Sequence, residues 1–387
     1  EIVDIKEDGS IFLNQKYFKY TYGLRMIKEK KFKELFGLNT RKEEEEITQI
    51  HCNIALAIQK VTEEIVINMV KETKKLTNSK NLCLSGGVAL NCVANGKIDE
   101  LGLFEKIYIQ PASGDAGGSL GAALSINHMY FGNDRYYSKD YDLMKGAYLG
   151  PYFSDKEILI TNKRYKAVYE NIESFEELSE IVAKLISQGN VIGWFQGRSE
   201  FGPRALGNRS ILADPRNPEM QKKLNLKIKY REGFRPFAPS VLEEDYKGFF
   251  NGKTMSPYML LVKKIKEKIK LKTPEGYWNL NYWDKLYTNR SKLQSITHVD
   301  FSARIQTVSK NTNPRFWNLI NEFKKITGVG VLVNTSFNVR GEPIVNSPED
   351  AFKCFLNTEM DYLVIENFLY KKKNQKTKIK KQQFKID

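Results

Sequence analysis

The chain has 387 residues, of which 41% are hydrophobic and 28% charged, a composition typical of globular proteins. Its length predicts two domains, and no run approaches the roughly 18 apolar residues that cross a bilayer. The formal net charge of +15 invites a nucleic-acid interpretation, but eight lysines and one aspartate after Tyr370 supply +7 of it. Because a lysine-rich tail with few apolar residues is usually solvated, we do not expect nucleic-acid binding. Because a long apolar run is missing, we do not expect a membrane span either.

The four cysteines form no C-x-x-C pair, and we interpret them as reduced, buried residues of a cytoplasmic protein. The sequence starts at Glu1 without Met and without a signal peptide, in what resembles a strand and turn (EIVDIKEDGSIFLN). We therefore expect the beginning of the protein to lie upstream of this chain.

Residues 1–150 are expected to form an α/β domain. Acidic residues, helically spaced apolar residues and closing lysines predict a long helix over 43–77. Apolar strands at 82–84 and 106–110 each run into a glycine-rich turn and then a helix. Two such turns place two helix N-termini near the ends of adjacent strands, where α/β folds bind ligands. An irregular stretch rich in Tyr, Gly and Asp at 130–152 marks the domain boundary.

Residues 151–370 are expected to form a second mixed α/β domain, followed by a flexible basic tail at 371–387. The apolar strands of this domain are NVIGWFQG and VGVLVNTSFN. The loop GRSEFGPRALGNRS (197–210) follows the first strand and holds three arginines among three glycines and a proline. Helical patterns cover 174–189, 218–228, 313–328 and 347–358.

The two glycine-rich turns, SGGVALN and SGDAGGSLGAA, offer backbone N–H groups suited to a phosphate or an adenosine, although tight packing explains such glycines equally well. Asp115 in the second turn could reach a metal ion or a ribose, and its alternative role is to cap the following helix. The nucleotide-binding residues that we expect are Gly86, Gly87, Asn91, Gly114 and Gly118.

Basic residues dominate the second domain and lie in turn-like segments beside strands. Arginines in glycine- and proline-containing loops of separate segments typically converge on an anion, so we expect a phosphate site. The alternative is a set of salt bridges to Glu200, Glu232 and Glu342. The basic residues in question are Arg204, Arg209, Lys229, Arg231, Arg235, Arg304 and Arg340.

A protein nucleophile is poorly supported. The chain has three histidines and no G-x-S-x-G, H-E-x-x-H or Walker A sequence. His51 lies on the predicted long helix and is expected to pack against it or cap it. His298, two residues before Asp300, could orient an anion or act as a general acid or base.

Six long segments carry the most specific patterns in the chain: SGGVALNCVANGKI, PASGDAGGSLGAAL, GWFQGRSEFGPRALGNRSILADPR, KYREGFRPFAPSVLEED, HVDFSARIQTV and VLVNTSFNVRGEPIVNSPEDAF. In order and spacing they resemble the O-carbamoyltransferases of the NodU/CmcH type, from about Asp8 to Phe368. The resemblance implies an α/β protein made of the C-terminal half of an ASKHA, RNase H-like (TsaD-like) domain and a YrdC-like twisted-sheet domain.

The resemblance also implies a reaction. Carbamoyl phosphate and ATP give carbamoyl adenylate, with release of phosphate and pyrophosphate, and the carbamoyl group then passes to a hydroxyl of a sugar or natural product. K-Y-R and S-F-N match the Lys-x-Arg and Ser-x-Asn pairs that surround the anionic intermediate in YrdC proteins. The expected catalytic residues are Lys229, Arg231, Arg304 and His298. The residues expected to bind carbamoyl phosphate or the adenylate are Arg204, Arg209, Arg235, Ser336 and Asn338.

The resemblance is incomplete at the front. Family members carry an upstream pair of histidines that binds a divalent metal, Fe or Mg/Mn, with the aspartate that matches Asp115, and no histidine here fits that pattern. We therefore expect the N-terminal part to be lacking and to be supplied by upstream sequence or by another chain. The alternatives are a fragment that only forms carbamoyl adenylate, and an inactive or RNA-binding relic.

Overall fold

The computed structural model describes residues 1–42, 45–137 and 142–377, and the chain divides into two compact units. The first contains Glu1–Leu82 and Val93–Tyr108, and the second contains Cys83–Cys92 and Ile109–Asp387. The boundary expected near residue 150 lies inside the second unit. The reason is local pairing, because the Gly150 N–H donates to the Ser199 carbonyl at 2.9 Å.

The first unit is built around one long helix. The helix expected over 43–77 is α2, and it begins at Gln49, because Thr48 and His51 form a capping box at its N-terminus. His51 is thus a capping residue, one of the two roles expected for it, and residues 43–44 lie outside the described part. No helix among the described residues is long and apolar enough to cross a membrane. The other elements of this unit are β1 (Val3–Ile5), β2 (Ile11–Leu13), α1 (Glu29–Phe36) and α3 (Cys92–Glu100), alongside α2 (Gln49–Thr77).

The two expected strand, glycine turn and helix successions are present. Strands β3 (Asn81–Leu84) and β4 (Lys106–Ile109) pair in a two-stranded sheet. A 3₁₀ turn at Gly87–Leu90 follows β3, and α4 (Gly117–Ser125) follows β4. The Gly86 N–H donates to the Ser113 carbonyl at 2.8 Å, and this bond joins the two glycine-rich turns.

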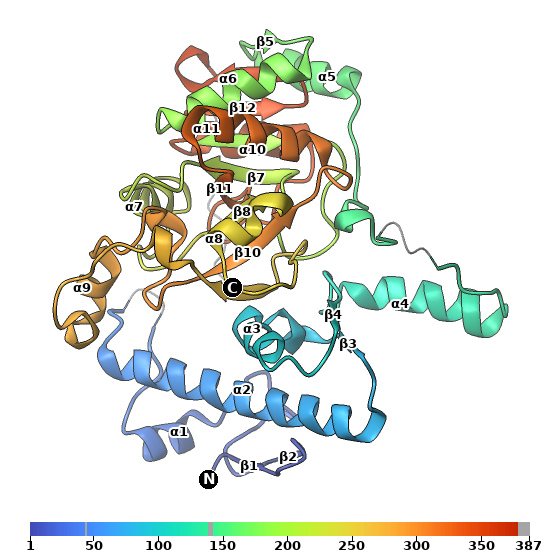
Figure 1. The fold of residues 1–387 in the computed structure, drawn as a ribbon, viewed down its shortest axis with the longest axis vertical. Helices are drawn as coiled ribbons and strands as arrows, with labels where there is room; N and C mark the ends of the chain where they lie inside the picture. The colour runs from blue at the N-terminus through green and yellow to red at the C-terminus, as the bar shows by residue number, and fades with distance from the viewer. Residues whose placement is uncertain (43–44, 138–141, 378–387) are drawn as a thin grey trace. The chain divides into compact units, whose positions relative to one another are not determined.

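The second unit contains a mixed sheet in which nine strands of the described residues run in the order β5-β13-β12-β6-β7-β11-β8-β10-β9 (Figure 1). The β6–β12 and β8–β10 pairs are parallel and the others antiparallel, which confirms the expected α/β class. The strands are β5 (Glu170–Asn171), β6 (Ile192–Phe195), β7 (Arg209–Ala213), β8 (Ala238–Leu242), β9 (Leu261–Lys264), β10 (Ser302–Val308), β11 (Val331–Ser336), β12 (Tyr362–Ile365) and β13 (Phe368–Lys371).

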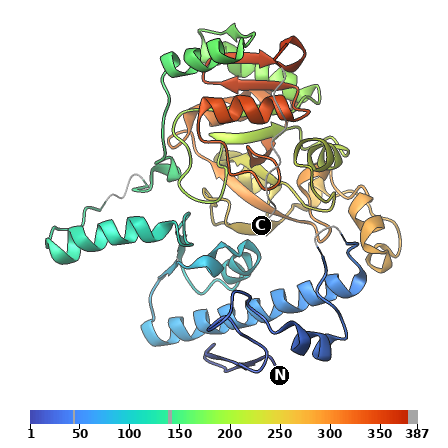
Figure 2. The same cartoon turned by 180° about the vertical axis from the view of Figure 1, so that it is seen from behind.

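Helices cover both faces of this sheet (Figure 1 and Figure 2). On one face α6 and α10 pack over a core that includes Trp194 and Leu332. On the other face α5 and α11 pack over a core that includes Phe195 and Phe337. The four helices are α5 (Asp155–Tyr165), α6 (Phe175–Ser187), α10 (Pro314–Thr327) and α11 (Pro348–Asn357), and the shorter ones are α7 (Met220–Lys223), α8 (Tyr246–Phe249) and α9 (Tyr282–Tyr287).

The described start of the expected flexible tail is packed against the sheet unit. Lys371 ends β13, and the Lys372 ammonium donates to the Thr358 carbonyl at 2.9 Å, at the C-terminal end of α11. A cation at that end satisfies carbonyls that the helix leaves free. The start of the tail is thus in contact with the sheet unit, the flexibility of the tail stays a prediction, and residues 378–387 lie outside the described part of the chain.

Candidate functional site

Lys229 lies inside the second unit and faces the turn that ends β11. It follows a π-helical turn at Leu224–Ile228, and 2% of its surface is exposed. Its ammonium donates to the carbonyl of Ser336, and lies 3.1 Å from the Ser336 hydroxyl. It also lies 3.0 Å from the Asn338 carbonyl and 2.8 Å from Asn338 Oδ1. The structure thus brings the K-Y-R and S-F-N motifs together.

The buried position of Lys229 disfavours the charged form of its amine. Burial, with a smaller effect from the positive charge of Arg231, lowers the pKa of the Lys229 amine to about 7. The ammonium therefore gains or loses its proton near neutral pH. Because four oxygens of the β11 turn already surround it, its first effect is to fix that turn.

Glu342 closes the same turn from the other side. Its carboxylate accepts the Val339 N–H at 2.8 Å, and its carbonyl accepts Nδ2 of Asn338 at 2.6 Å. Burial raises the pKa of the Glu342 carboxyl. The side-chain oxygens of Ser336 and Asn338 are consequently held in one arrangement, in which the Ser336 hydroxyl donates to Asn338 Oδ1 at 2.7 Å.

Two arginines from separate segments form a cationic site that has no counterion among the residues that the structure describes. Arg304 lies on β10, and burial together with the neighbouring charge of Arg204 lowers its pKa to about 10. Within the described residues, the Arg304 guanidinium makes no hydrogen bond and no ion pair. Arg204 donates one bond to the Leu90 carbonyl at 3.3 Å, its buried Nε has no partner there, and burial lowers its pKa.

Arg231 belongs to the same electrostatic neighbourhood. Its Nε donates to Asn225 Oδ1 at 2.8 Å, and its guanidinium lies 5.2 Å from the centre of the Phe237 ring. Burial, then the charge of Arg235, and also that of Arg304 lower its pKa to about 10. We call Arg204, Arg231 and Arg304 the arginine cluster. Glu232 partly offsets the charge of Arg231, whereas Arg204 and Arg304 have no carboxylate partner among the described residues. Cations of the latter kind are suited to bind a phosphate, which supplies the missing charge.

The remaining expected arginines are used differently. Arg235 forms an ion pair with Glu232 at 2.9 Å, and Arg340 lies 4.0 Å from the same carboxylate. The salt-bridge alternative therefore holds for these two residues. The pair leaves Arg235 at the edge of the cluster, where it acts through its charge on Arg231.

Arg209 is fully buried and serves the structure of the loop. Its guanidinium donates to the carbonyls of Gln196 at 2.8 Å and Gly197 at 3.1 Å, among others, and stacks 3.5 Å from the centre of the Phe195 ring. Burial lowers its pKa to about 10. Its two terminal nitrogens are occupied by carbonyls, and only its buried Nε has no partner among the described residues. The geometry therefore gives less support to the expectation that Arg209 binds the ligand.

His298 is a buried histidine whose lowered pKa makes it a weak base at neutral pH. Burial lowers its pKa to about 4, and its Nδ1 lies 3.1 Å from the Ser302 hydroxyl. Asp300 accepts bonds from that hydroxyl at 2.6 Å and pairs with Lys264 at 2.8 Å. The histidine thus belongs to a turn that leads into β10, and the geometry does not support its expected acid or base role.

The glycine-rich turns leave open space beside most of their glycines. A Cβ added at Gly86, Gly87, Gly114 or Gly118 would meet no atom within 4 Å, whereas one at Gly117 would lie 2.2 Å from the Ala112 carbonyl. Gly117 is therefore required for packing. Asn91 closes the first turn, and its N–H donates to the Val88 carbonyl at 2.9 Å.

Asp115 alone does not fit a divalent metal. Its side chain is exposed, and the described residues contain no group of three or more His, Cys, Asp or Glu that could hold an ion. A divalent cation with protein ligands usually takes several carboxylates or imidazoles. The expected Fe or Mg/Mn site is thus not supported by these residues, and we derive no step through a metal.

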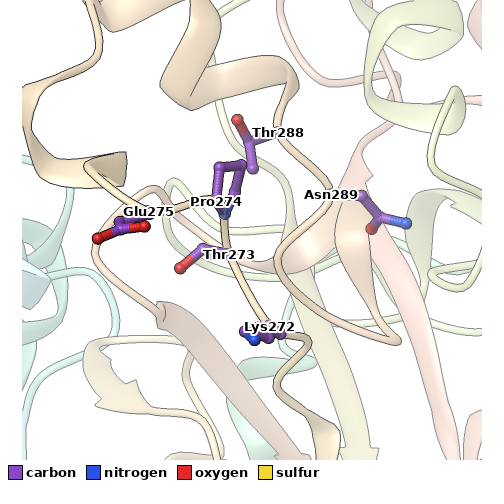
Figure 3. Close-up of a pocket in the computed structure, with 6 residues that line it drawn as sticks. All are labelled: Lys272, Thr273, Pro274, Glu275, Thr288 and Asn289. Atoms are coloured by element: carbon purple, nitrogen blue, oxygen red, sulfur yellow. The ribbon is translucent and has the colours of Figure 1, made fainter.

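An open pocket of about 940 Å³ lies elsewhere in the second unit (Figure 3). No residue expected to act in the site lines it, and the side chains drawn in Figure 3 do not converge on one point. We therefore locate the candidate site by its uncompensated charge and not by its volume. The residues lining the pocket are Lys272, Thr273, Pro274, Glu275, Thr288 and Asn289.

Two sets of hydrogen bonds at the site were not predicted from the sequence. Glu200 accepts the N–H groups of Leu206 and Asn208, at 2.7 and 2.9 Å, and so shapes the arginine-bearing loop. Gln306 and Asn334, both buried in the sheet, bind carbonyls of the same loop. The sequence signal that could have predicted the second set is a glutamine or asparagine within an otherwise apolar strand, because buried amides need hydrogen-bond partners.

Comparison with known sequences gives the family of the chain. Residues 1–124 match the family model described as carbamoyltransferase N-terminus, and residues 183–372 match that described as carbamoyltransferase C-terminus. The chain belongs to the carbamoyltransferase family. The expectation that the N-terminal part is lacking is not supported, since the N-terminal model matches from residue 1.

Similar curated proteins agree with this family. An uncharacterized protein of Synechocystis is 52% identical over 97% of this chain and 61% of its own length. The nodulation protein NolO of Bradyrhizobium diazoefficiens is 40% identical over 88% of this chain and 58% of its own length. The 3'-hydroxymethylcephem-O-carbamoyltransferase of Streptomyces clavuligerus is 29% identical over 83% of this chain and 54% of its own length. The chain thus spans between half and two thirds of the length of these relatives.

Among solved structures, full-length HypF in a phosphate- and nucleotide-bound form is similar at a TM-score of 0.33. That similarity has 14% sequence identity and covers 68% of this chain and 36% of that chain. It is too weak to carry an argument about fold or ligand.

Proposed function

We propose that the chain carries out O-carbamoyl transfer, with the arginine cluster as the site for carbamoyl phosphate. The observation that carries this proposal is the Arg204–Arg304 neighbourhood, where two half-buried guanidinium groups lack a counterion within the described residues. A carbamoyl phosphate dianion would supply that charge and accept the free N–H donors. Membership of the carbamoyltransferase family selects this anion among the phosphates that such a site could bind.

The proposed first reaction joins carbamoyl phosphate and ATP. With one water molecule consumed, it yields carbamoyl adenylate, phosphate and pyrophosphate. The groups that change are phosphates and developing oxyanions, which fixed cations and oriented dipoles stabilise without a protein nucleophile. In this scheme Arg204, Arg231 and Arg304 hold the anions, and Lys229 sets the turn that presents Ser336 and Asn338.

The proposed second reaction passes the carbamoyl group from the adenylate to a hydroxyl of a sugar or natural product, with release of AMP. The open glycine-rich turns are the proposed nucleotide site, since the space beside Gly86 and Gly114 lets a ligand approach the backbone closely. The TsaD-like and YrdC-like division of the chain is part of this proposal. So are a cytoplasmic location and the use of ATP.

Pyrophosphate release from ATP tests the first reaction. We expect release that requires carbamoyl phosphate, is lost in Arg304→Met, and persists in Arg198→Ala, which removes an exposed arginine of the same loop. Release that does not depend on carbamoyl phosphate, or that survives Arg304→Met unchanged, would contradict the proposal.

A further inference from the structure

Two members of the arginine cluster, Arg204 and Arg304, repel each other. Arg204 and Arg304 come from different segments, carry like charges and lie near enough that Arg204 lowers the pKa of Arg304. Repulsion and the cost of burial both favour movement of the Arg204 loop away from β10. Some interaction must therefore hold the loop in place before an anion arrives.

We propose that Gln306 is a positioning residue that ties the Arg204 loop to the strand carrying Arg304, so that the anion site is preformed. This inference rests on the proposed function for the identity of the anion. Gln306 lies on β10 two residues after Arg304, and alternate residues of a strand share one face. Its Nε2 donates to the carbonyl of Leu206, two residues after Arg204, at 2.7 Å.

The orientation of the Gln306 amide is determined by its other partners. Its Oε1 accepts the Ser240 hydroxyl of β8 at 2.6 Å and Nδ2 of Asn334 of β11 at 2.9 Å. Two donors on the oxygen leave the amide nitrogen facing the loop. Gln306 is 2% exposed, and Ser240 and Asn334 are fully buried, so water does not compete for these bonds.

Leu206 is held at both polar groups of its backbone. Its carbonyl accepts from Gln306 and, at 2.8 Å, from the Tyr148 hydroxyl, while its N–H donates to Glu200 at 2.7 Å. Asn334 adds a bond to the carbonyl of Ala205 at 3.2 Å. The peptide groups next to Arg204 are thus fixed by the sheet together with Tyr148 and Glu200, and binding does not have to pay the entropy of ordering this loop.

Hydrogen exchange tests the positioning role without any ligand. In Gln306→Met, we expect the amides of Leu206 and Asn208 to exchange about tenfold faster, the change for one lost buried hydrogen bond. Gln306→Glu keeps the side-chain volume and the acceptors for Ser240 and Asn334, replaces the donor to Leu206 by a carboxyl oxygen, and should give the same result if Gln306→Met folds poorly.

Thr307→Val is the matched control. Thr307 is the next residue of β10, is buried, and accepts the Ser256 N–H at 3.0 Å, so the variant loses a bond of similar kind away from the Arg204 loop. Exchange at Leu206 should not change in it. Equal exchange in the control and in both Gln306 variants would overturn the proposal.

Calorimetric titration with carbamoyl phosphate tests the consequence for the site. We expect Gln306→Met to weaken binding about tenfold, and to have no further effect in a chain that already carries Arg204→Met. Additive losses in the double variant would show that Gln306 does not act through Arg204. If the unaltered chain does not bind carbamoyl phosphate, the proposed function fails, and the exchange result still decides the role of Gln306.

Discussion

The amine of Lys229 is bound twice by Asn338, at 2.8 Å from its side-chain oxygen and 3.0 Å from its carbonyl. With the two oxygens of Ser336, these contacts offer more acceptors than the three protons of an ammonium can serve. Lys229 is therefore first a structural residue of the β11 turn. Its chemical role follows from the turn that it fixes and from its unusual pKa.

The low pKa of Lys229 predicts how stability depends on pH. Between the folded value of about 7 and the ordinary value of 10.5, the unfolded chain binds a proton that the folded chain does not. The cost of charging Lys229 is thus fully present below pH 7 and is relieved as the pH rises toward 10.5. The free energy of unfolding, relative to Lys229→Met, should rise by up to about 1.4 kcal/mol per pH unit in this window.

Urea unfolding of both chains at pH 6, 7.5 and 9 measures this difference. A difference that stays constant over the three pH values would show that Lys229 titrates normally. The Met variant serves as its own control, because it keeps most of the side-chain volume and cannot titrate.

Arg304→Met should stabilise the free protein while it weakens ligand binding. Replacing an uncompensated buried cation by an apolar side chain commonly raises the free energy of unfolding, here by about 1 to 3 kcal/mol. Arg304→Ala should weaken carbamoyl phosphate binding by roughly 1.5 to 3 kcal/mol. Thermal unfolding without ligand checks the first effect, and a destabilised Arg304→Met would mean that the guanidinium has a partner.

Arg209→Met should instead destabilise the protein by about 3 to 5 kcal/mol, because it leaves several buried carbonyls without donors and removes the stacking on Phe195. Urea unfolding measures the loss. Arg198→Ala, in the same loop but exposed, should change stability by less than about 0.5 kcal/mol. Equal effects of the two substitutions would contradict the structural role given to Arg209.

His298 should be neutral throughout the physiological range. NMR titration of its ring should give a pKa of about 4, and the unfolded value is near 6.5. The folded chain therefore binds fewer protons than the unfolded one between these values, and His298 costs stability as the pH falls from 6.5 to 4. His298→Gln should remove that part of the acid sensitivity, and a ring that titrates near 6.5 would refute this assignment.

Local patterns in the sequence predict the helices, strands and turns well. They predict less well whether a polar side chain has a structural or a binding role. Helical spacing and capping residues predict α6, α10 and α11 to within two residues of their ends, and the glycine-rich segments predict the turns after β3 and β4. The motif pairing of Lys229 with Ser336 follows from the family resemblance, because these residues are far apart in sequence. Their catalytic roles stay predictions.

The sequence does not distinguish Arg204 from Arg209, although both lie in one loop. Arg209 begins β7, and its register against Phe195 of β6 turns it into the sheet, where it meets carbonyls. Arg204 lies before that strand and meets Arg304, which is 100 residues away in the chain. The different roles of the two arginines depend on tertiary contacts, which cannot be predicted from the sequence pattern of the loop.

The most direct test of the central claim is calorimetric binding of carbamoyl phosphate to the unaltered chain, Arg304→Met and Arg198→Ala. We expect binding to the unaltered chain and to Arg198→Ala with equal affinity, and a loss of at least about tenfold in Arg304→Met. Equal affinity in all three chains, or no binding to any of them, would contradict the assignment of the arginine cluster as the carbamoyl phosphate site.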